Sequence, residues 1–69
     1  MALDQTKQLQ ALRQVSAQAR AARTKLRELE ARRNGMIARL RRAGVGTGDI
    51  AAACSLSPGR VTQIVDLML

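Results

Sequence analysis

The side chains of this 69-residue chain that can do chemistry are hydrogen-bond donors and cations, and one informative group of them lies between Ser57 and Ile64. The run Ser57-Pro-Gly-Arg-Val-Thr-Gln-Ile carries Arg60, Thr62 and Gln63 at spacings that leave them on the outer side of one helix. Guanidinium, hydroxyl and carboxamide groups bind phosphates and the edges of bases. Binding, and not bond breaking, is therefore the chemistry that these residues predict.

A second group of cations precedes this run. Five arginines lie between positions 32 and 42 with no acidic residue among them: Arg32, Arg33, Arg39, Arg41 and Arg42. The whole chain has twelve Lys or Arg against five Asp or Glu, a formal net charge of +7. A small domain this basic most often meets nucleic acid, and next most often an anionic membrane surface. We interpret the five arginines as phosphate contacts, the alternative being a solvated helical face.

The residues needed for catalysis are missing. The sequence has no His, a single Cys and no phosphate-binding loop, so we expect no enzyme activity, no cofactor and no metal site. Cys54 is expected to be a small buried hydrophobe. The chain has no Phe, Tyr or Trp on which single-stranded bases could stack. No apolar run is long enough to span a bilayer and no signal peptide is recognisable, so we expect a cytoplasmic protein with no membrane partner.

The polar helix is expected to begin at Ser57, whose side chain caps it, with Pro58 in the first helical position. Its apolar residues Val61, Ile64 and Val65 should face inward. These residues predict a helix with one buried and one polar side.

A shorter helix over residues 48–54 should precede it, capped by Thr47 and carrying Asp49 in its first turn. Ile50, Ala51 and Cys54 fall on one face of this helix. Ser55 and Leu56 would then form the turn between the two helices.

One long helix is predicted from Leu3 to Ala43, where there is no proline and only one glycine. Gly44 is expected to end it in the left-handed conformation. Asn34-Gly35 is the weak point, because this dipeptide often marks a turn. Apolar periodicity continues past it to Met36, so we favour a continuous or slightly bent helix over a break.

Apolar residues along this helix recur at alternating spacings of three and four, the heptad a/d pattern of a coiled coil. They are Leu12, Val15, Ala19, Ala22, Leu26 and Leu29, followed by Met36 and Leu40 after a break at Arg33. This seam predicts a homodimer, the alternative being a single solvated helix. Lys25 at position g and Glu30 at the following e position favour parallel pairing.

The stretch from Thr47 to Asp66 resembles the helix-turn-helix family. The family has a small residue where its two helices cross, here Ala51, and apolar residues at four further positions, here Ile50, Leu56, Val61 and Ile64. Ser55 stands where a turn glycine is usual. Residues 32–65 are most similar to region 4 of bacterial sigma factors and the small phage or actinobacterial regulators built on it. Arg60, Val61, Gln63 and Ile64 match the sigma recognition helix, whereas Pro58 and Thr62 depart from it.

The heptad pattern and the resemblance together predict an all-α fold with a coiled-coil dimerisation helix over residues 3–33 and a helix-turn-helix DNA-binding unit over residues 34–69. The function we expect is that of a small dimeric transcriptional regulator that binds specific duplex DNA sequences and is located in the cytoplasm, on the nucleoid. The implied base-reading residues are Ser57, Gly59, Arg60, Thr62 and Gln63. Two alternatives stay open: a coiled-coil adaptor that binds another protein such as RNA polymerase, and a non-specific nucleoid-type DNA binder.

Overall fold

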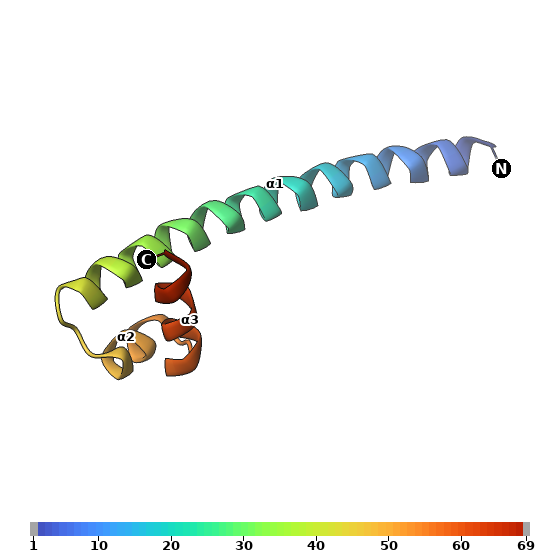
Figure 1. The fold of residues 1–69 in the computed structure, drawn as a ribbon. Coiled ribbons are helices and arrows are strands. Elements are labelled where there is room, and N and C mark those ends of the chain that lie inside the picture. Colours follow the sequence, from blue (N-terminus) through green and yellow to red (C-terminus); the bar gives the residue numbers. More distant parts are fainter. Residues whose placement is uncertain (1, 69) are drawn as a thin grey trace.

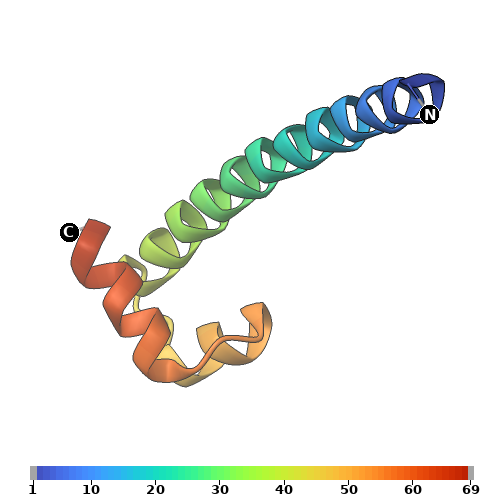
Figure 2. The same ribbon diagram turned by 90° about the vertical axis from the view of Figure 1, so that its right-hand side faces the viewer.

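The computed structural model describes residues 2–68, with side chains described from Asp4 onward. It contains three helices: α1 (Ala2–Arg42), α2 (Thr47–Cys54) and α3 (Pro58–Met68). In Figure 1, α1 is a long rod, and α2 and α3 pack together beneath its C-terminal end. The view in Figure 2 shows that most of the rod stands clear of the two short helices. The predicted all-α fold with a long N-terminal helix is confirmed.

The long helix passes through Asn34 and Gly35 without a break, as predicted. Arg33 donates two hydrogen bonds, from Nε and Nη2, to Asn34 Oδ1, each 3.1 Å long. Asparagine favours turns because its side chain competes for nearby backbone groups. The Asn34 side-chain oxygen is engaged by Arg33 instead, which weakens that competition and helps the helix to continue.

The end of α1 is a Schellman motif. Gly44 has φ +91°, in the left-handed region that the sequence predicted for it. The Gly44 N–H donates to the carbonyl of Arg41 and the Val45 N–H donates to the carbonyl of Leu40, each at 3.1 Å. These two bonds satisfy carbonyl groups that the end of a helix leaves unpaired. The chain can therefore reverse direction immediately after α1.

The start of α2 corrects the sequence prediction by one residue. The cap is Gly46, in extended conformation, and Thr47 is the first helical residue, with no side-chain capping bond. The Ile50 N–H donates to the Gly46 carbonyl at 3.1 Å, which closes the first turn around glycine. Threonine is a better N-cap residue than glycine because its side chain can accept a hydrogen bond. The backbone turn after Gly44 nevertheless starts the helix one residue earlier than Thr47 as a cap would.

The turn between α2 and α3 depends on Ser55, which adopts φ 58° and ψ 33°. This left-handed conformation is the one expected of the residue that replaces the usual turn glycine. It costs a residue with a Cβ atom about 1–2 kcal/mol. The N–H groups of Ser55 and Leu56 both donate to the carbonyl of Ala51, which compensates part of this cost.

A small aliphatic core joins the three helices. Its buried members come from all of them: Ile37, Ile50, Ala51, Val61, Ile64 and Val65. Val45, Cys54 and Leu56 are partly buried against it. The inward faces predicted for α2 and α3 are therefore confirmed. Cys54 is only partly buried, and its thiol lies 3.8 Å from the Ala51 carbonyl oxygen.

Outside this core, α1 has no packing partner in the described part of the chain. The large residues of the predicted seam remain about half exposed, from 42% at Leu40 to 61% at Val15. Among the described residues, no helix is both long enough and apolar enough to cross a bilayer.

Replacement of Gly35 by alanine should stabilise the protein. A Cβ atom at this position would have nothing within 4 Å, and glycine inside a helix is about 0.8–1 kcal/mol less favourable than alanine. We expect Gly35→Ala to raise the free energy of unfolding by about 1 kcal/mol in urea titrations followed by circular dichroism. A loss of stability would mean that α1 bends at Gly35 in solution.

Replacement of Ala51 by leucine should destabilise the protein. Ala51 is 4% exposed, within the core, and a larger side chain would overpack that site at a cost of about 1–3 kcal/mol. Ala52→Leu is the matched control, because Ala52 is exposed on the same helix. Equal thermal melting temperatures for the two variants would contradict the packing described here.

Candidate nucleic-acid interface

The start of α3 is built by local hydrogen bonds that the sequence predicted. The backbone N–H of Arg60 donates to Ser57 Oγ at 3.1 Å, and the N–H of Val61 donates to the Ser57 carbonyl at 3.1 Å. Pro58 has no N–H to leave unpaired in the first turn. Of the first three residues of α3, only Gly59 keeps a backbone N–H that no group in the described structure accepts.

The outer face of α3 carries the polar side chains predicted for it. Arg60, Thr62 and Gln63 are all exposed, while Val61 and Ile64 between them are buried. Ser57 and Gly59 lie at the N-terminal end of the same helix and are also exposed. The five predicted base-reading residues therefore share one end of one helix.

Side-chain hydrogen bonds hold two of these residues in place. Thr62 Oγ1 donates to the Pro58 carbonyl at 3.1 Å, which leaves the methyl group and the hydroxyl lone pairs of Thr62 for a partner. Arg60 Nη1 donates to Gln63 Oε1 at 3.4 Å, which leaves the two N–H groups of the Gln63 carboxamide. The surface that remains offers donors from Arg60 and Gln63 and an apolar methyl group from Thr62.

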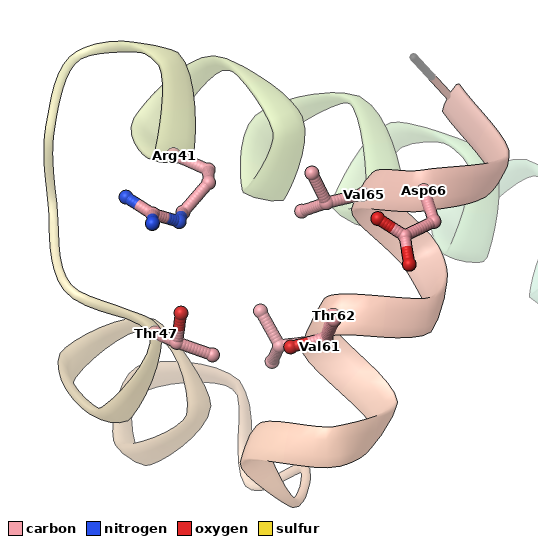
Figure 3. Close-up of a pocket in the computed structure, with 6 residues that line it drawn as sticks. All are labelled: Arg41, Thr47, Val61, Thr62, Val65 and Asp66. Carbon is pink, nitrogen blue, oxygen red and sulfur yellow. The ribbon is translucent and has the colours of Figure 1, made fainter.

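A pocket beside this surface brings one cation next to α3. Figure 3 shows Arg41 of α1 and Thr47 of α2 facing α3 across it, where Val61, Thr62, Val65 and Asp66 form the opposite wall. Arg41 comes four residues after Ile37, about one turn later, and so lies on the face of α1 that meets the two short helices. Neither Thr47 nor Asp66 was predicted from the sequence to line this pocket.

The five arginines predicted as one phosphate cluster do not share a face. Arg39 is two residues after the buried Ile37, about half a turn away, so it points away from α2 and α3. Arg32 is seven residues before Arg39, about two turns, and lies on that same outer face. Arg33 is partly buried and bound to Asn34, and Arg42 is exposed to the side. Only Arg41 is brought beside α3.

Three arginines that were not predicted as phosphate contacts lie on the side of α1 that meets α2 and α3. Arg20 and Arg27 precede Asn34 by whole multiples of seven residues, and Arg23 precedes Arg41 by eighteen, about five turns. All three therefore project from the side of the rod under which α2 and α3 pack. The sequence feature that indicates them is the recurrence of arginine at whole numbers of helical turns. A search for segments of dense charge does not detect this recurrence.

The cations on this side of α1 outnumber the carboxylates near them, which are those of Glu30 on α1 and Asp66 on α3. The side chains of Arg20, Arg23, Arg27 and Arg41 are exposed, and no ion pair forms within the part of the chain that is described. Glu30, three residues after Arg27, makes no ion pair with it. Like charges three and four residues apart on a helix repel each other. This face of α1 therefore has the charge to attract a polyanion.

An apolar groove lies where the seam of α1 meets α2. It is lined by Arg33, Met36, Ile37 and Leu40 from α1 and by Ile50, Ala53 and Cys54 from α2. Arg33, Met36 and Leu40 are the a and d positions that continue the heptad pattern past Leu29. The exposed seam and this groove thus form one continuous surface.

Removal of the Ser57 cap should destabilise α3. Ser57→Ala removes the acceptor for the Arg60 N–H, and loss of such a cap costs about 0.5–2 kcal/mol. Ser57→Asp is the control, because aspartate caps helices as well as serine does. We expect the alanine variant alone to melt at lower temperature by circular dichroism, and equal melting of both variants would show that the cap contributes nothing.

No family model matches the chain, and no curated protein or solved structure matches it either. The functional assignment therefore depends on the geometry of α3 and its surroundings.

Proposed function

We propose that this protein is a sequence-specific, double-stranded DNA-binding protein, a small dimeric transcriptional regulator. In this proposal α2, the Ser55 turn and α3 act as a helix-turn-helix whose second helix enters the major groove. The observation that carries the proposal is the outer face of α3, where Arg60, Thr62 and Gln63 are exposed and Thr62 shares a pocket with Arg41 of α1. The site of action would be the nucleoid in the cytoplasm.

The side chains of α3 suit base edges. A glutamine carboxamide pairs with adenine, an arginine guanidinium pairs with guanine, and a threonine methyl group contacts the methyl group of thymine. The absence of a bulky residue at Gly59 lets the backbone approach the DNA, and the free Gly59 N–H can donate to a phosphate oxygen.

The charge distribution suits a duplex. Arg41, Arg20, Arg23 and Arg27 add cations on the side of α1 where the two short helices lie. Phosphate contacts of this kind give affinity and salt dependence but read no sequence. Specificity would therefore come from α3 and affinity largely from α1.

The exposed seam of α1 supports self-association. Leu12, Val15, Leu26 and Leu29 lie on one face and are each about half exposed, and most of the stability of a helix in a protein comes from packing of its apolar face. A second copy would cover these side chains.

Selection from random duplex DNA tests the reading role of α3. We expect an enriched motif, on which Thr62→Ala and Gln63→Ala each lose roughly 1–3 kcal/mol of binding free energy while binding to random DNA changes little. Gln18→Ala, on the exposed arm of α1, is the control. Equal losses on specific and random DNA would exclude base reading, and strong binding with no motif would indicate a non-specific nucleoid-type protein.

Arg41 and Arg39 should differ in their effect on binding, although both are exposed arginines near the end of α1. Arg41→Gln should weaken duplex binding and reduce the slope of log affinity against log salt by up to about one unit. Arg39→Gln should change neither, because Arg39 faces away from α3. Fluorescence anisotropy over a series of salt concentrations measures both effects. An equal response of the two variants would place the DNA on a different face.

A further inference from the structure

The apolar stripe of α1 has a symmetry that bears on how two copies meet. Read from either end about its centre, the order of side chains is the same: two large residues, two alanines, two large residues. We infer that α1 pairs with α1 of a second copy in the antiparallel direction, in the register where Ala19 faces Ala22. This inference rests on the homodimer of the proposed function and names its geometry.

The register follows from the a and d positions. In the antiparallel pair Leu12 faces Leu29, Val15 faces Leu26, and Ala19 faces Ala22, each combination occurring twice by the two-fold symmetry. Large side chains fill the outer layers and small ones let the helices approach at the centre. The same six residues can also pair in parallel, so the direction is decided by what flanks them.

Arg33 opposes the parallel arrangement. It occupies the a position that follows Leu29 and lies at the groove, so parallel helices would bring two Arg33 side chains into one layer of the seam. Like charges placed opposite each other at an interface are strongly unfavourable. In the antiparallel register Arg33 faces Gln8, which is neutral. The parallel pair gains only the surface pair of Lys25 and Glu30, and ion pairs at a protein surface contribute little.

In the same register, the N-terminal end of α1 of the second copy lies in the apolar groove between α1 and α2. Gln5 of the second copy faces Met36, so the first turns of its α1 run into the groove that Met36 and Leu40 form with Ala53 and Cys54. The part of the apolar surface around Met36 is then covered by the same interface. No separate partner is needed for it.

Symmetry also places the two α3 helices. Ile37, on the face that packs on α2 and α3, follows the seam residue Met36 by one position, about a quarter turn around the rod. A two-fold axis between antiparallel helices leaves both such faces on one side of the pair, whereas a parallel axis turns them to opposite sides. Arg20, Arg23 and Arg27 of both copies then join both α3 helices on one basic face.

Spin labels at Gln10 measure the direction of pairing. In Cys54→Ala protein labelled at an introduced Gln10→Cys, the antiparallel register separates the two labels by about 32 Å along the rod. Parallel pairing keeps them level, about 20 Å apart across two helix diameters. A label at Ala21, close to the centre, is the control, because it gives the short distance in both arrangements. A short distance at Gln10 would overturn the inference.

Complementary charges test the register independently. Val15→Glu and Leu26→Lys should each give a monomer by sedimentation, since each places an unpaired charge in the seam. Mixed in equal amounts, the two variants should form a dimer. Only in the antiparallel register would the carboxylate introduced at position 15 of one copy face the ammonium group introduced at position 26 of the other. A mixture that stays monomeric would contradict this register.

Failure of this inference is distinguishable from failure of the proposed function. If the wild-type protein binds duplex DNA and the labelled variant shows the short distance at position 10, the function stands and the antiparallel geometry is wrong. An antiparallel dimer that does not bind duplex DNA keeps the geometry and loses the function.

Discussion

Packing of Ile37 from α1 against α2 and α3 is the interaction on which the rest of the structure depends. Ile37 is 3% exposed, and the residues it joins, Ile50, Ala51, Val61 and Ile64, are buried to a similar degree. All are aliphatic, and the core holds no buried polar group among the described residues. Such a core fixes the helices by shape alone, which is why the small volume of Ala51 matters as much as the area that Val61 buries.

Because Ile37 belongs to the long helix, the short helices are attached to the rod and not to a flexible linker. The Schellman motif at Gly44 ends α1 and turns the chain back at once. The cap at Ser57 then fixes where α3 begins. The Schellman motif at Gly44, the Ser57 cap and the packing of Ile37 therefore set the angle between α1 and the polar face of α3. Arg41, which follows Ile37 on the same side of α1, keeps a constant relation to that face for the same reason.

Much of the fold could be predicted from the sequence, because its signals are local. Gly44, Ser57 and Pro58 act through their own backbone preferences, and the inward faces of α2 and α3 follow from spacing alone. Thr47 was predicted as the N-cap of α2 but is its first helical residue. The capping preference of a side chain does not show at which residue the preceding backbone turn ends. The assignment of a helix-turn-helix that binds DNA remains a prediction.

The candidate site was less predictable, for a geometrical reason. Charge density along a sequence does not measure charge density on a face, since neighbouring residues on a helix point about 100° apart. Arg39 and Arg41 are close in sequence and lie on opposite sides of α1. Arg20 and Arg27 are distant in sequence and lie on the side of Arg41. Their common side becomes visible only when the packing of Ile37 defines which side of the rod matters.

The glycine at position 35 has a mechanical consequence. It lies between the exposed arm of α1 and the turn that carries Ile37, in a place with room for a larger side chain. Glycine gives the helix its least resistance to bending, since it adds no side-chain contacts and has the widest backbone freedom. The rod is therefore most compliant just where the arm joins the packed unit. Such a joint lets the angle between arm and unit adjust by a few degrees, at low elastic cost, to the curvature of whatever surface they share.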